Sequence, residues 1–230
     1  MMLTIQDIKN AYEPLRNEAN RKQMESYMKN QFQFLGIKKS ETAPIMRKLF
    51  KEFGLPNDKG DVKQLVMNCF SEQEREYHYI GMIILNKSSE LFHGEDLSFI
   101  KSIILTHTWW DSVDTIAPNI LGDIVKRSPE VKLELCEWCL DDNFWLKRAA
   151  LLHQLKFKQQ MDLPLLEQMI DHLKEDKEFF IRKAIGWILR EYSKTDAAYV
   201  INFMQQHTLS NLTSKEALKW LNNQESYKIN

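Results

Sequence analysis

A short stretch of the chain, TWWDSVD, places bulky indole rings beside carboxylates. Trp110 and Asp114 are four residues apart, so on an α-helix they share one face, one turn apart. Trp109, Val113 and Ile116 lie on a different, apolar face and are expected in the core. Indole faces attract cations, and a carboxylate stabilises a neighbouring positive centre or orients a water molecule. The Trp110 and Asp114 pair therefore suits a reaction that develops positive charge.

Related residue types recur further along the chain at a constant offset. DNFWLKRAALL (142–152) matches KEFFIRKAIGW (177–187) at an offset of 35, with an aromatic pair, two basic residues and then alanine. A repeat of about 35 residues built from two helices is typical of an α-solenoid, and this pattern is HEAT-like. Equivalent positions of stacked repeats lie side by side. We therefore expect one concave wall carrying Trp110, Asp114, Arg148, Lys183 and Trp187, with Arg190 beyond them.

The elements that must position this wall are predicted to be helices throughout, in one HEAT-like repeat domain over residues 1–230. Apolar residues recur at helical spacing nearly everywhere, and the chain has only 7 glycines and 6 prolines. An all-β chain needs frequent turns, so this scarcity favours long helices joined by short loops. We expect about ten to twelve helices of ordinary length. Short breaks are predicted around Asp141, Asp162, Asp176 and Thr195, and Pro118 is expected to bend the backbone at Asp114.

The charge is segregated although the formal net charge is only -1. Basic residues dominate 38–51 and 143–161, whereas acids dominate 52–96. Such a chain can present one basic face to the phosphates of DNA, which supply affinity without sequence preference. Cys136 and Cys139 form a lone C-x-x-C with no second pair, so we expect no metal site and no cofactor. No apolar run approaches a membrane span, and we expect a cytoplasmic protein without a membrane partner.

The wall has one candidate carboxylate, and this restricts the reaction. Glycosidic bond cleavage passes through a positively charged, oxocarbenium-like sugar, and ordinary glycosidases use a second carboxyl group to protonate the leaving group. That acid is unnecessary when the leaving base already carries a fixed positive charge, as an N3- or N7-alkylated purine does. The residues therefore favour cationic nucleotides over normal ones.

The sequence resembles the bacterial DNA alkylation repair enzymes of the AlkD type, which are HEAT-like DNA glycosylases. The matching stretches are YMKNQFQFLGIKK, WWDSVDTIAPNILGDI, DNFWLKRAALLHQLKFKQQMD and KEFFIRKAIGWILREYSKT. The resemblance implies that Trp110, Asp114 and Trp187 are catalytic, that Arg148 is a DNA-contacting arginine of the catalytic site, and that Tyr27 is an aromatic near the lesion. It also implies excision of 3-methyladenine, 7-methylguanine or bulkier adducts from duplex DNA without enclosing a flipped base. The DNA-binding residues expected with Tyr27 are Lys29, Lys156, Lys183 and Arg190.

Two other interpretations of the sequence stay open. A HEAT-like module can bind DNA without chemistry, and a solenoid can act as a scaffold for an acidic protein partner. Singly, Trp110 and Trp187 suit a core, Asp114 suits a surface or a cap, and Arg148 suits a tie between repeats. Their combination favours an enzyme. No oligomer signal or obligate protein partner is evident, and we expect a monomer.

Overall fold

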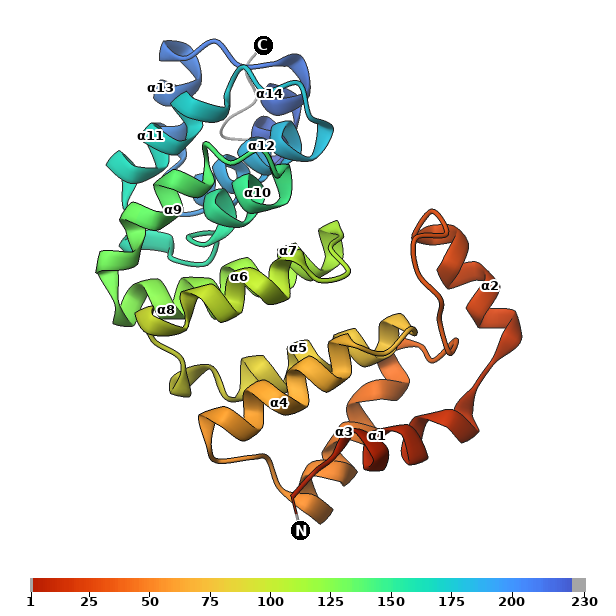
Figure 1. The fold of residues 1–230 in the computed structure, drawn as a ribbon. Helices are drawn as coiled ribbons and strands as arrows, with labels where there is room; N and C mark the ends of the chain where they lie inside the picture. Colours follow the sequence, from red (N-terminus) through yellow and green to blue (C-terminus); the bar gives the residue numbers. More distant parts are fainter. Residues whose placement is uncertain (1, 225–230) are drawn as a thin grey trace. The chain divides into compact units, whose positions relative to one another are not determined.

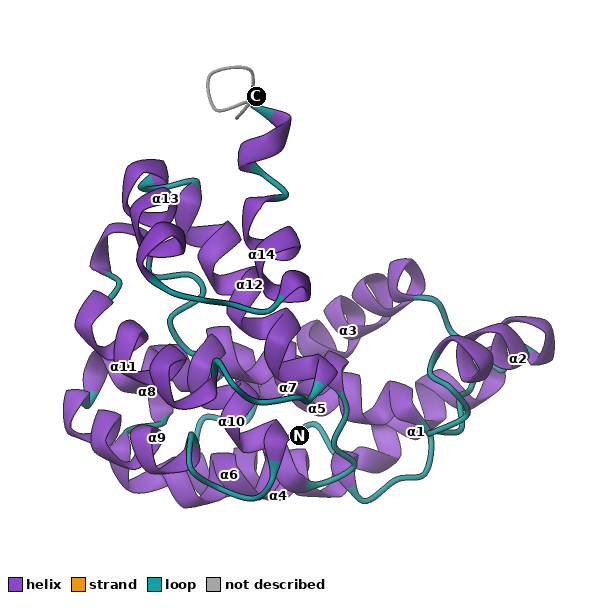
Figure 2. Cartoon of the chain, turned by 90° about the horizontal axis from the view of Figure 1, so that it is seen from above, coloured by secondary structure: helices purple, strands orange, loops and turns teal. Residues whose placement is uncertain are grey.

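The computed structural model describes residues 2–224, and helices form the regular structure of this part of the chain (Figures 1 and 2). No strand occurs among these residues, and the sole β-type pairing recorded there is an isolated bridge between Gln33 and Glu74. The all-α prediction is therefore confirmed. The helices run from α1 to α14, more than the ten to twelve expected, because several are shorter than ten residues. None of the described helices is long and apolar enough to cross a membrane.

The chain divides into two compact units, Met1–Phe92 and His93–Asn230. The single repeat domain expected over 1–230 stays a prediction. The first unit contains α1 (Ile5–Tyr12), α2 (Glu18–Tyr27), α3 (Lys39–Phe53), α4 (Lys59–Phe70) and α5 (Arg75–Lys87). Side chains of Thr4, Asn17 and Asp58 accept backbone N–H groups at the first turns of α1, α2 and α4, which fixes where these helices begin.

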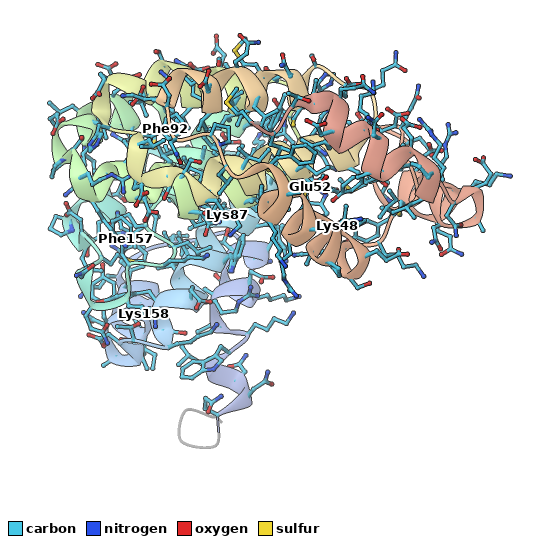
Figure 3. All side chains as sticks on the ribbon, turned by 90° about the horizontal axis from the view of Figure 1, so that it is seen from below. Lys48, Glu52, Lys87, Phe92, Phe157 and Lys158 are labelled. Atoms are coloured by element: carbon cyan, nitrogen blue, oxygen red, sulfur yellow. The ribbon has the colours of Figure 1, made fainter. Side chains whose placement is uncertain are left out.

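Helix α3 shows how the first unit separates core from surface. Its Met46 and Leu49 are buried, whereas Lys48 and Glu52 are exposed (Figure 3). Helix α5 is covered on most sides, and even its Arg75 and Glu76 are buried. Helix α4 packs against α5, and α1 packs against α3 and α4, so these helices bury their apolar stripes against one another.

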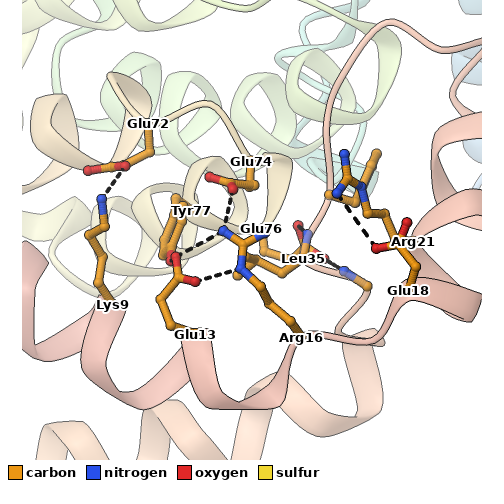
Figure 4. Close-up of polar contacts among 12 residues, drawn as sticks. Lys9, Glu13, Arg16, Glu18, Arg21, Leu35, Glu72, Glu74, Glu76 and Tyr77 are labelled. Atoms are coloured by element: carbon orange, nitrogen blue, oxygen red, sulfur yellow. Dashed lines mark hydrogen bonds and ion pairs between the residues drawn. The ribbon is translucent and has the colours of Figure 1, made fainter.

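A buried carboxylate holds the loop between α2 and α3. Glu76 is 2% exposed and accepts the backbone N–H of Leu35 at 2.9 Å (Figure 4). It also accepts the backbone N–H groups of Gly36 and Ile37 at 2.9 and 3.0 Å. Gly36 has a φ of 89°, and a Cβ there would lie 2.1 Å from the carbonyl oxygen of Asn17. Burial raises the pKa of Glu76, although the three N–H groups oppose that shift. The loop after α2 is thus fastened to α5.

The second unit carries the repeat. Its helices are α6 (Leu97–Leu105), α7 (Trp110–Ile116), α8 (Gly122–Arg127), α9 (Lys132–Trp138), α10 (Phe144–Leu152), α11 (Leu163–Leu173), α12 (Phe179–Ser193), α13 (Ala197–Gln206) and α14 (Asn211–Leu218). The breaks predicted around Asp141, Asp162, Asp176 and Thr195 are confirmed, since each separates two of these helices.

Helices α10 and α12 pack against each other as equivalent members of successive repeats. They begin at Phe144 and Phe179, which reproduces the offset of 35 seen in the sequence. The aromatic residues at their N-terminal ends are in contact: the Trp145 and Phe180 ring centroids are 4.8 Å apart, and Phe144 stacks parallel to Phe180 at 6.2 Å. Trp109 joins this aromatic cluster at 5.7 Å from both Trp145 and Phe180. The repeated aromatic pairs therefore form the seam of an α-solenoid of HEAT-like repeats.

Pro118 interrupts the helix in a different place from the one predicted. Helix α7 is regular through Asp114 to Ile116, and the irregular segment is a π-turn over Ala117–Leu121. The proline has no N–H to give to the Asp114 carbonyl, and the wider turn accommodates its ring. Within this segment the side-chain amide of Asn119 donates to the carbonyl oxygen of Thr115 at 2.5 Å. The backbone distortion therefore follows Asp114 rather than occurring at it.

Candidate active site

The carboxylate of Asp114 is held by the guanidinium of Arg148. Nε and Nη2 of Arg148 donate to Oδ1 and Oδ2 of Asp114 at 2.8 and 2.9 Å, which is a bidentate pair between α7 and α10. Nη1 donates to the carbonyl oxygen of Phe180, the second residue of α12, at 2.5 Å. Arg148 is 4% exposed. One arginine therefore ties three helices together and sets the orientation of the carboxylate.

The surroundings of Asp114 act on its pKa in opposite directions. Burial raises it, hydrogen bonds and charge attraction from Arg148 lower it, and the neighbouring Asp111 raises it again. The net direction is upward, so burial outweighs the arginine. The side chain of Asp114 is still 16% exposed, and its two oxygens have lone pairs that Arg148 does not use. The carboxylate can therefore still accept a hydrogen bond from outside or face a positive centre.

The three tryptophans of the sequence prediction have distinct positions. Trp110 is the first residue of α7, one turn before Asp114, and is half-buried. Trp187 is half-buried on α12, one turn after Lys183. Trp109 packs in the aromatic cluster but is half-buried rather than fully in the core, and it precedes α7 in extended conformation (φ −157°) rather than lying on its apolar face. All three rings thus keep partial solvent access.

Lys183 and Arg190, expected on the wall as DNA-binding residues, are both engaged by one carboxylate. Each forms an ion pair with Glu216 of α14. Burial and the charges of Arg190 and Arg148 lower the pKa of Lys183. Sequence reasoning missed Glu216, because it lies in the least diagnostic stretch of the chain and no spacing pattern marks it.

A basic pocket adjoins Trp187. It has a volume of about 810 Å³ and is lined by three lysines, Lys156, Lys158 and Lys194, with Glu191 as its carboxylate. Lys156 donates to the Asn119 side chain at 2.5 Å and is exposed. Lys158 lies next to Phe157 after α10 (Figure 3), with a positive φ of 50°. The cation expected at Lys156 is therefore accompanied by two that the sequence did not single out.

The remaining expected DNA contacts are in the first unit. Tyr27 ends α2 and is 70% exposed, and Lys29, which follows it with a φ of 57°, is exposed as well. Both residues belong to the first compact unit, Met1–Phe92. Cys136 lies in α9 and Cys139 at its C-terminal cap, both as free thiols. No cluster of three metal-binding side chains occurs within residues 2–224.

The fold and the site together define a class of helical-repeat proteins in which an aspartate held by an arginine shares its helix with one half-exposed indole, and a helix of a later repeat carries a second indole with cations. The model of the DNA alkylation repair enzyme family matches residues 8–221, and the chain belongs to this family. It is also similar to the solved structure of a "Predicted DNA alkylation repair enzyme from Enterococcus faecalis", with 32% identity and a TM-score of 0.80 over 91% of this chain and 98% of that one. Comparison with curated proteins finds no match. Family membership assigns the chain a role in DNA alkylation repair, with DNA as its substrate.

Proposed function

We propose that the protein is a monofunctional DNA glycosylase that hydrolyses the N-glycosidic bond of cationic alkylated purines in duplex DNA. The observation that carries the proposal is the Asp114 carboxylate, held in one orientation by Arg148 while one edge still reaches solvent. A fixed carboxylate is preorganised to stabilise positive charge at the sugar carbon C1′, and it does so without reorganising during the reaction.

The reaction needs no acid on the leaving group. As the C1′–N9 bond of 7-methylguanine or the equivalent bond of 3-methyladenine breaks, its electron pair neutralises the positive charge of the base. The sugar becomes an oxocarbenium-like cation, which faces Asp114 and a water molecule oriented by it. The water oxygen bonds to C1′ and its proton passes to Asp114 or to solvent. The products are a free neutral base and an abasic site.

The indoles of Trp110 and Trp187 add cation attraction worth about 0.5–2 kcal/mol each, depending on how far the site excludes water. Arg148 in this proposal acts on Asp114 rather than on DNA, because its guanidinium is buried against Asp114 and Phe180. Lys156 and the pocket lysines suit phosphate contacts, and Tyr27 and Lys29 are proposed to contact DNA from the first unit. Such a site recognises the lesion without a base-shaped pocket, which would admit bulkier N3 and N7 adducts. We propose a cytoplasmic monomer that needs no cofactor.

The test is release of methylated bases from duplex DNA treated with a methylating agent, measured under single turnover with enzyme in excess. Asp114→Asn should lower the rate of 7-methylguanine release by about a hundredfold or more, the range of a lost catalytic proton acceptor or electrostatic stabiliser. DNA affinity should be unchanged. Asp111→Asn is the matched control, since it removes a carboxylate from the same helix without removing the Arg148 pair.

Undiminished base release by Asp114→Asn would remove this residue from the mechanism. Wild-type protein that binds methylated duplex but releases no base over long incubation would instead support a DNA-binding module without chemistry. The basic pocket beside Trp187 is the observation that favours this second candidate. A peptide that stays bound in excess duplex would point to a protein scaffold.

A further inference from the structure

The last described α-helix, α14, packs closely against α12 at the turn that carries Trp187. A Cβ on Gly186 would lie 2.5 Å from the Cβ of Glu216 and 2.7 Å from the carbonyl oxygen of Thr213. The hydroxyl of Thr213 also donates to the carbonyl oxygen of Arg182 at 3.2 Å. Any side chain larger than hydrogen at residue 186 would therefore push the two helices apart.

The carboxylate of Glu216 is bound from both sides of this turn. Lys183 lies one turn before Trp187 and Arg190 lies three residues after it, so the three share one face of α12. Both cations form ion pairs with Glu216, which is 9% exposed. A buried carboxylate with two cationic partners is costly to disturb, because removing it leaves two partly buried charges without their counterion. The ion pairs of Lys183 and Arg190 with Glu216 therefore lie on both sides of the turn of α12 that carries Trp187.

We propose that Glu216 is a positioning residue for Trp187: it holds Lys183 and Arg190 and thereby fixes the turn of α12 that presents the indole. The inference rests on the proposed function, in which Trp187 stabilises the sugar cation. A displacement of about 1 Å at a reacting centre can cost on the order of a hundredfold in rate, so a loosened indole should slow the chemistry. An alternative use of Glu216 is competition with DNA, since it occupies two cations that phosphates would otherwise bind.

The two uses separate in one set of variants of the full chain. Glu216→Gln removes the charge and keeps the shape, whereas Gly186→Ala keeps every charge and forces α14 away. Under single turnover on methylated duplex, positioning predicts that each variant slows base release by about tenfold while the Kd for unmodified duplex stays unchanged. Glu167→Gln is the matched control: it removes a carboxylate that joins α11 to α13 through the Tyr199 hydroxyl at 2.6 Å, and its rate should equal that of the wild type.

A double-mutant cycle distinguishes positioning of Trp187 from a general loss of structure. In a Trp187→Ala background, Glu216→Gln should slow base release no further, because the ring it positions is gone. Equal slowing in both backgrounds would overturn the proposal. An unchanged rate of base release in Glu216→Gln would also overturn it. If DNA binding is at the same time tighter in this variant, the result is the one that competition with DNA predicts. A wild type without base release refutes the proposed function and this inference together, whereas an active wild type with an equally active Glu216→Gln variant refutes this inference alone.

Discussion

Replacing Arg148 with methionine removes the guanidinium and leaves the Asp114 carboxylate buried without its partner. The contacts of Arg148 in the structure determine how much folding free energy this change should cost. Two charge-assisted bonds to Asp114 and one to the Phe180 carbonyl are lost, from a side chain that is only 5% exposed. Breaking a buried ion pair by removing one partner costs about 3–5 kcal/mol. Because the Asp114 side chain is 16% exposed and water can reach one edge, we expect a loss near the lower end, about 3 kcal/mol.

The measurement is a double-mutant cycle on the free energy of unfolding, with Arg148→Met, Asp114→Asn and the double variant in urea at neutral pH. For a chain of this size a loss of about 3 kcal/mol lowers Tm by roughly 6–12 °C. The double variant should be more stable than Arg148→Met alone, because asparagine carries no charge that needs a partner. We expect a coupling energy of about 2–3 kcal/mol between the two positions.

The cost of Arg148→Met should also depend on pH. Without the guanidinium the pKa of Asp114 rises further, so the folded state binds a proton more readily than the unfolded state does. The stability of this variant relative to wild type should therefore recover as the pH falls. A coupling energy below about 0.5 kcal/mol would refute the reasoning, since residues that do not interact are additive within that range. So would a relative stability that does not improve on acidification.

Three further predictions concern other parts of the molecule. Burial raises the pKa of Asp114, so the rate of single-turnover base release should begin to fall on acidification at a pH above the ordinary aspartate range, because protonation removes the charge that faces the sugar. A pH–rate profile with its acid limb at ordinary aspartate values would contradict this. Glu76→Gln should destabilise the first unit by about 2–3 kcal/mol and speed amide exchange at Leu35, Gly36 and Ile37. The control is Glu72→Gln, which removes a less buried carboxylate that pairs with Lys9. Unchanged protection of those three amides would count against the anchoring role of Glu76. Lys156→Met should reduce by about one the slope of the logarithm of the duplex-binding constant against the logarithm of salt concentration. Lys174→Met is the control and should leave this slope unchanged, because Lys174 pairs with Asp171. Equal slopes for wild type and Lys156→Met would exclude a phosphate contact at Lys156.

Much of the fold follows from repetition in the sequence. The aromatic pair at 144–145 and its copy at 179–180 predicted that α10 and α12 are equivalent, and their rings are in contact. The acidic and polar breaks predicted the helix ends from the end of α9 to the start of α13, because polar residues at these breaks, such as Asn143, Asp162 and Glu178, cap the helices that follow through their side chains. Individual short helices such as α7 and α8 were harder to predict, since a π-turn joins them without a polar break.

The site was predictable where helix spacing alone determines which residues share a face. Trp110 and Asp114, and Lys183 and Trp187, follow from a spacing of four residues. The partner of each charge was not predictable, because ion pairing depends on packing between helices that are distant in sequence. Arg148 binds Asp114 34 residues away, and Glu216 binds Lys183 33 residues away. The roles of all these residues in catalysis and DNA binding stay predictions.

The π-turn at Ala117–Leu121 can also be regarded as a single-residue insertion in a continuous helix from Trp110 to Arg127. One extra residue shifts the side-chain phase by about 100°, since an α-helix has 3.6 residues per turn. The wider turn takes up the extra residue locally, so the helical segments on both sides keep the faces they present, with Asp114 bound to Arg148 and Ile124 and Val125 buried. The distorted turn thus lets one helix serve both the candidate site and the core.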